Sequence, residues 1–140
     1  MNMPKQPNRI IETGIYVDDT ERSVAFYERV LGGRRMGCSE RLGTVDIGGQ
    51  SVLLIFKKGG SIKPTQIPGG LIPGNDATGQ MHFAFAIEPE EFENWQAWLP
   101  TQGVEIESIV NWDRGGRSIY FRDPDGHNVE LATPGIWDIY

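Results

Sequence analysis

The chain has 140 residues and a mass of 15.6 kDa, the size of one domain or of two half-domains with a common core. With 39% hydrophobic and 23% charged residues, its composition is typical of a folded globular protein. The net charge of −6 argues against binding along a nucleic-acid backbone, and no apolar run is long enough to cross a membrane.

The sequence also bears on the compartment. Cys38 is the only cysteine, which excludes an intramolecular disulfide, a zinc ribbon and an iron–sulfur cluster. The first ten residues lack the apolar stretch of a signal peptide. Both observations lead us to expect a cytoplasmic protein.

The first half predicts a β-α-β-β-β order. The cluster Asp18-Asp19-Thr20 is typical of a helix start, Ser23–Leu31 has helical apolar spacing, and Gly32-Gly33 ends it. Gly48-Gly49 is typical of a hairpin turn between two strands. The predicted strands are Ile10–Val17, Arg34–Glu40, Leu42–Ile47 and Ser51–Lys57.

From Lys58 to Gln80 the sequence is rich in Gly, Pro, Ser, Thr and Asn and shows no periodicity. Loops of this length are uncommon in compact proteins and are often functional, but a plain tether between the halves fits equally well.

The β-α-β-β-β order then returns. A helix is predicted over Glu88–Leu99, with Pro89 suited to its first turn and Pro100 and Gly103 at its end. The predicted strands are Met81–Ile87, Val104–Val110, Arg117–Arg122 and Asn128–Ala132. The two halves form a weak repeat in which Glu12 and His82 hold equivalent positions.

Alternation along the strands places Glu12, His82 and Glu130 on faces otherwise lined by small residues. Two carboxylates and one imidazole form a ligand set that suits Mn, Fe, Ni, Co or Zn. The alternative is that each of the three side chains is satisfied separately, in an ion pair or as a partly buried histidine.

Four stretches match a known family: Glu12–Asp19, Phe26–Gly32, His82–Phe85 and Tyr120–Leu131. On these residues the chain resembles the vicinal-oxygen-chelate superfamily of glyoxalase, bleomycin-resistance and extradiol-dioxygenase proteins. The resemblance implies an α+β fold of two paired βαβββ modules with curved mixed sheets. Residues 1–140 would then be one domain with modules at about 9–58 and 80–134, joined by a loop at 59–79.

The resemblance also implies a divalent metal held by Glu12, His82 and Glu130. In metal-dependent members the first position is usually His, and here Glu12 replaces it. Lyases of the glyoxalase I type take a further ligand from the fourth strand, where this chain has only Leu53 or Leu54, which argues against lactoylglutathione lyase activity. Family members dimerise, and in one arrangement Glu12 comes from one subunit and His82 and Glu130 from the other.

Two further sets of candidates complete the predicted site. Tyr120, ten residues before Glu130, stands where extradiol dioxygenases carry an active-site tyrosine, so Tyr120 and Glu130 are the catalytic candidates. The substrate-binding candidates are Arg117, Arg122 and Trp112. His127 is interpreted as a turn residue.

Three functions remain open. The first is a metal-dependent enzyme that chelates two oxygens of a small molecule, either a dioxygenase or a lyase/isomerase. The second is a metal-free binding protein of the bleomycin-resistance type. The third is a thiol transferase of the fosfomycin type, which needs cationic groups for a phosphonate. In each case we expect a small-molecule substrate or ligand and a homodimer, with no nucleic-acid or membrane partner.

Overall fold

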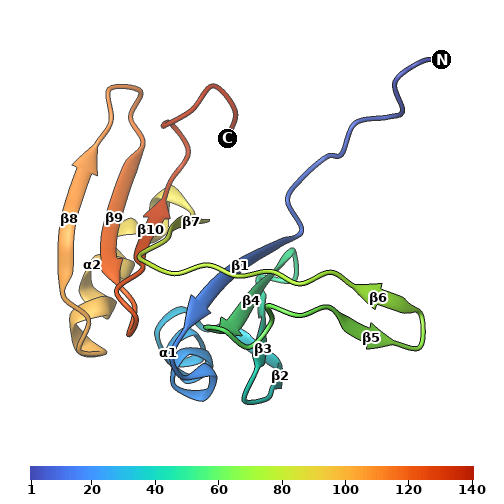
Figure 1. The fold of residues 1–140 in the computed structure, drawn as a ribbon. Helices are drawn as coiled ribbons and strands as arrows, with labels where there is room; N and C mark the ends of the chain where they lie inside the picture. The colour runs from blue at the N-terminus through green and yellow to red at the C-terminus, as the bar shows by residue number, and fades with distance from the viewer. The chain divides into compact units, whose positions relative to one another are not determined.

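The computed structural model describes residues 1–140, which divide into two compact units, Met1–Thr78 and Gly79–Tyr140. Each unit contains one four-stranded mixed sheet (Figure 1). The predicted α+β class with a repeated βαβββ order is confirmed. No helix combines the length and the apolar character that a membrane crossing requires.

In the first unit, helix α1 (Thr20–Leu31) follows strand β1 (Glu12–Val17). The Asp19 side chain accepts a hydrogen bond from the Arg22 backbone N–H at 3.0 Å and so caps the helix, and Gly32, with φ 71°, ends it. Three strands complete the sheet, in the order β1-β4-β3-β2: β2 (Arg34–Cys38), β3 (Leu42–Ile47) and β4 (Ser51–Lys57).

The second unit repeats this plan with β7 (His82–Ala86), α2 (Phe92–Thr101), β8 (Ile106–Asn111), β9 (Arg117–Arg122) and β10 (Asn128–Ala132). Its sheet order, β7-β10-β9-β8, is that of the first unit. The predicted helix over Glu88–Leu99 is instead a short 3-10 turn, η1 (Pro89–Glu91), followed by α2. Pro100 lies inside the last turn of α2, where its missing N–H removes only one helical hydrogen bond, and the chain leaves the helix at Gly103, with φ 73°.

The repeat extends to the strand register. In each unit the first strand pairs in parallel with the last, and Glu12 lies opposite Val52 as His82 lies opposite Asn128. The equivalence of Glu12 and His82 is therefore present in the structure. By the same register, Leu54 opposite Gly14 is the counterpart of Glu130 opposite Ala84.

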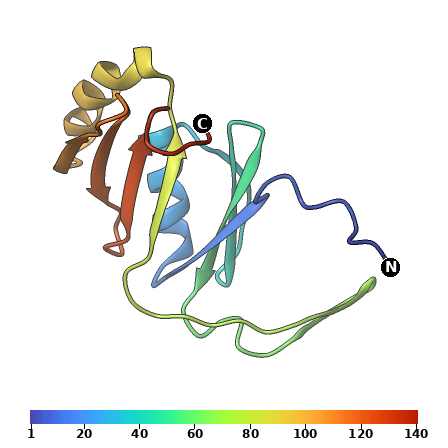
Figure 2. The same cartoon turned by 90° about the horizontal axis from the view of Figure 1, so that it is seen from above.

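The segment predicted as an unstructured loop contains a small hairpin, β5 (Thr65–Ile67) and β6 (Gly70–Ile72). Each strand has only three residues, too few for a period to emerge from the sequence. The hairpin extends away from the sheet of its own unit in both views (Figures 1 and 2).

The core of the first unit lies between α1 and one face of its sheet. Val24 of α1 and Val45, Leu53 and Ile55 of the sheet are at most 1% exposed. The backbone at Gly43 approaches α1 so closely that an added Cβ would lie 2.4 Å from Val24 Cγ2. This contact brings the helix against the sheet.

We predict that Gly43→Ala destabilises the protein by about 1–3 kcal/mol, because a β-branched core side chain must move to accept the methyl group. The measurement is urea unfolding. Gly37→Ala in β2 is the control, since its Cβ would lie 3.4 Å from Thr44 Oγ1, and equal stability of the two variants would contradict the close packing described.

Candidate functional site

An imidazole and a carboxylate meet on adjacent strands of the second unit. Glu130, in the middle of β10, is only 7% exposed, whereas the side chain of His82, at the start of β7, is half exposed. His82 Nε2 lies 3.3 Å from Glu130 Oε1. The structure thus brings together two of the three predicted metal ligands, a buried carboxylate with a solvent-facing imidazole above it.

The orientation of His82 is fixed by the backbone. Its Nδ1 lies 2.9 Å from the carbonyl oxygen of Asn128. A carbonyl oxygen only accepts hydrogen bonds, so Nδ1 carries the proton, and in the neutral ring Nε2 presents a lone pair to Glu130 Oε1. Two acceptors that face each other need a proton or a cation between them.

This donor set fits a divalent transition metal. Metal-binding histidines usually donate their second ring N–H to a carbonyl or carboxylate, as His82 does to Asn128. An imidazole nitrogen with a carboxylate oxygen suits Mn, Fe, Ni, Co and Zn.

The second oxygen of Glu130 is held by Ser118. Ser118 Oγ, which is fully buried in β9, donates to Glu130 Oε2 at 2.5 Å. The Trp112 indole Nε1–H donates to the same Oγ at 2.9 Å, so Ser118 accepts one hydrogen bond from the indole while it donates one to the carboxylate. Trp112, a substrate-binding candidate, therefore supports Glu130 through Ser118.

Tyr120, the second catalytic candidate, lies directly opposite Glu130 in the β9–β10 ladder. Its ring centroid is 6.2 Å from that of His82. Burial raises the pKa of the Tyr120 phenol above its ordinary value, and the negative charge of Glu130 raises it further. The phenol is therefore protonated at neutral pH and able to donate a hydrogen bond.

The two candidate arginines lie on opposite faces of the sheet. Arg117 points to α2, where its guanidinium lies 3.7 Å from the Phe92 ring centroid and 2.6 Å from Glu93 Oε1, so the structure does not bring it together with Glu130. Arg122 shares the strand face of Tyr120 and is paired with Glu107 at 3.0 Å.

Glu12, the third predicted ligand, belongs to the first unit. It is exposed at the start of β1, on the strand face of Tyr16, whose ring stacks on Phe56 at 5.3 Å. No group of three or more His, Cys, Asp or Glu side chains in the structure is arranged to hold a metal ion. His82 and Glu130 form a pair.

His127 has a structural position in the turn before β10, as interpreted from the sequence. It is fully buried, and its Nδ1 accepts the backbone N–H of Met81 at 3.0 Å. Asp123 Oδ1 accepts the backbone N–H groups of Asp125 and His127 and shapes the same turn. Together these bonds fix the backbone immediately before His82.

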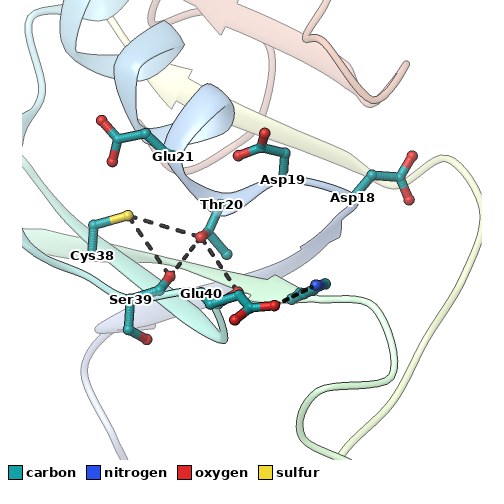
Figure 3. A pocket seen from close by; sticks show the side chains of 8 residues that line it. Asp18, Asp19, Thr20, Glu21, Cys38, Ser39 and Glu40 are labelled. Carbon is teal, nitrogen blue, oxygen red and sulfur yellow. Dashed lines mark hydrogen bonds and ion pairs between the residues drawn. The ribbon is translucent and has the colours of Figure 1, made fainter.

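An acidic cavity of about 440 Å³ lies in the first unit beside the start of α1, with Cys38 and several carboxylates in its wall. The Asp18 carboxylate points away from those of Asp19 and Glu21, and the three do not meet at a common centre (Figure 3). Burial raises the pKa of the Cys38 thiol, which opposes its ionisation to a nucleophile. We assign this cavity no function.

Two βαβββ units of one topology, with a histidine and a glutamate on adjacent parallel strands, define a protein of the vicinal-oxygen-chelate type. Residues 9–131 match the model of the Glyoxalase/Bleomycin resistance protein/Dioxygenase superfamily, and the chain belongs to this superfamily.

The chain is similar to curated proteins named metallothiol transferase FosB. It is 34% identical over 124 residues to that of Staphylococcus saprophyticus, covering 87% of this chain and 74% of the relative. For the Bacillus licheniformis protein the identity is 32% over 123 residues, with 87% and 73% covered.

Among solved structures, the crystal structure of lactoylglutathione lyase from Agrobacterium tumefaciens is similar to this chain with a TM-score of 0.86. The sequence identity is 30%, and the alignment covers 96% of this chain and 100% of that chain. The fold and family follow from these likenesses, whereas the reaction has to be argued from the residues.

Sequence reasoning missed the role of Ser118. The available signal was its place on the same strand face as Tyr120, where a small hydroxyl can reach a carboxylate on the neighbouring strand.

We predict that Ser118→Ala lowers the free energy of unfolding by about 1–3 kcal/mol, because Glu130 Oε2 and the Trp112 N–H both lose their partner. Urea unfolding measures the change. Ser108→Ala, at an exposed position of β8, should be nearly neutral. A Ser118→Ala protein as stable as Ser108→Ala would contradict the network.

Proposed function

We propose that this protein is a metal-dependent enzyme that acts on a small molecule, and that its reaction is the transfer of a thiol. The metal dependence is supported by the 3.3 Å distance between His82 Nε2 and Glu130 Oε1. A hydrogen bond to the Asn128 carbonyl oxygen orients His82, and a hydrogen bond from Ser118 orients Glu130. The thiol chemistry is supported by the likeness to the metallothiol transferases.

The strand register favours thiol transfer over the lyase reaction. The lyase type takes a fourth-strand ligand, and Leu54 is the counterpart of Glu130 in the first unit. Leucine can neither bind a metal nor move a proton. The likeness to the lactoylglutathione lyase structure therefore extends to the fold, and we do not extend it to the reaction.

We propose Glu12 as the third ligand because it is the counterpart of His82 in the repeat. In the dimeric arrangement of the family it would come from the other subunit of a homodimer. Glu12, His82 and Glu130 would hold a divalent cation, which would supply positive charge to stabilise an oxyanion on the substrate.

The remaining residues act on the substrate and on Glu130. The Tyr120 phenol, kept protonated, donates a hydrogen bond to a substrate oxygen on the Glu130 side of the sheet. Ser118 keeps Glu130 Oε1 directed at His82, and the Trp112 indole N–H donates a hydrogen bond to Ser118. Of the two candidate arginines, only Arg122 lies on the strand face of Tyr120, and its guanidinium is paired with Glu107.

We predict that the protein purified without tag or chelator contains about one transition-metal ion per chain by elemental analysis. His82→Ala and Glu130→Ala should each abolish the metal and leave the fold intact by circular dichroism, and Glu12→Ala should also lose it. Glu107→Gln, which removes an exposed carboxylate of β8, is the matched control and should keep the metal. Full metal content in His82→Ala and Glu130→Ala would show that these residues are not the metal ligands. A wild-type protein that takes up no metal would favour a metal-free binding protein.

We predict a thiol-dependent reaction when the metal-loaded protein is given a low-molecular-weight thiol and an epoxide acceptor such as fosfomycin. The thiol sulfur bonds to an epoxide carbon, the carbon–oxygen bond breaks, and the oxygen takes up a proton. Loss of free thiol, stopped by a chelator, is the expected result. Isomerisation of a glutathione hemithioacetal without thiol loss would instead assign the lyase reaction.

A further inference from the structure

A second cavity of the first unit lies between the start of β3 and the segment that carries the β5–β6 hairpin. Its volume is about 300 Å³, and Arg41 and Lys63 line it. The same two side chains also line an adjoining cavity of about 440 Å³. No acidic residue lines either cavity, although the protein has 19 acidic and 13 basic residues.

The charge of Arg41 is not neutralised within the protein. Its guanidinium forms no ion pair, and neither does the Lys63 ammonium. Most other arginines of the sheets and turns have a carboxylate partner: Arg34, Arg35, Arg114, Arg117 and Arg122. Two uncompensated cations at one cavity form a local positive field that attracts an anion.

Arg41 is nevertheless held in position. Its Nε donates to the Gly60 carbonyl oxygen at 2.8 Å, and its Nη2 donates to Thr65 Oγ1 at 3.3 Å. The remaining N–H groups on the two Nη atoms are left for another acceptor, and the planar guanidinium suits the paired oxygens of a carboxylate or phosphate. An arginine fixed before binding loses less entropy when an anion binds.

The two ends of the segment that carries the hairpin, near Ser61 and near Asn75, are joined by a backbone hydrogen bond. The Asn75 backbone N–H donates to the Ser61 carbonyl oxygen at 2.8 Å. Gly74 packs so tightly that an added Cβ would lie 1.9 Å from the Ile62 carbonyl oxygen. The cavity wall that includes Lys63 is therefore set by backbone contacts.

The floor of the cavity is apolar. Leu42 and Phe56 line it and lie opposite each other in the β3–β4 ladder, and Ile72 of the hairpin adds a third apolar side chain. Phe56 stacks on Tyr16 at 5.3 Å, which fixes its ring. A ligand for this cavity therefore needs an apolar group beside its charge.

We propose that the Arg41–Lys63 cavity binds a small organic oxyanion, a phosphate ester, phosphonate or carboxylate that carries an apolar group. The oxyanion contacts Arg41 and Lys63, and the apolar group rests on Leu42 and Phe56. None of Glu12, His82 and Glu130 lines this cavity, so the proposal does not rest on the proposed metal-dependent reaction.

The test is isothermal titration calorimetry of the full chain at low salt with phenyl phosphate, phenylacetate, inorganic phosphate and benzyl alcohol. Saturable binding of phenyl phosphate is expected, stronger than that of inorganic phosphate or benzyl alcohol and weakened by added salt. Phenylacetate distinguishes a carboxylate site from a phosphate site, and either as the tighter ligand supports the proposal.

Arg41→Gln and Lys63→Gln should each weaken binding of phenyl phosphate roughly tenfold or more. Lys63→Gln tests the site without disturbing the contacts of Arg41 to the loop. Arg29→Gln, which removes an exposed cation of α1, is the matched control and should bind normally. The proposal is overturned if phenyl phosphate does not bind, if both cavity variants bind like Arg29→Gln, or if His82→Ala abolishes binding.

Discussion

The site depends on one constraint, the burial of the Glu130 carboxylate in the middle of a sheet. A buried carboxylate is costly unless its oxygens are hydrogen-bonded or paired. Ser118 satisfies one oxygen and leaves the other directed at His82. The Trp112 indole N–H donates to the Ser118 oxygen, which leaves the serine hydroxyl free to donate to Glu130. The hydrogen bond from His82 to Asn128 thus sets the position of the imidazole, and the hydrogen bond from Ser118 sets the direction of the Glu130 carboxylate.

The repeat explains why the two units differ in chemistry although they share a topology. At the position of Glu130 the first unit has Leu54, and at the position of His82 it has Glu12. The second unit therefore holds a pair of donor groups, whereas at the equivalent positions the first unit has one carboxylate and one leucine.

Much of this could be predicted from sequence because strand alternation and helix caps are local. Arg117, named from the sequence as a substrate-binding candidate, instead lies against Phe92 of α2; strand alternation, which puts it on the face opposite Tyr120, was the signal that could have shown this. The Ser118–Trp112 contact could not be predicted, because it depends on the register between β8 and β9. The Arg41–Lys63 cavity could not be predicted either, because it forms where the start of β3 meets the hairpin segment, whose sequence shows no periodicity.

The most direct measurement is anomalous diffraction from crystals grown with Mn²⁺, recorded near the absorption edge of manganese. The account predicts an anomalous peak within bonding distance of His82 Nε2 and Glu130 Oε1. A peak confined to the acidic cavity beside α1, or full metal occupancy with no peak at His82, would contradict it.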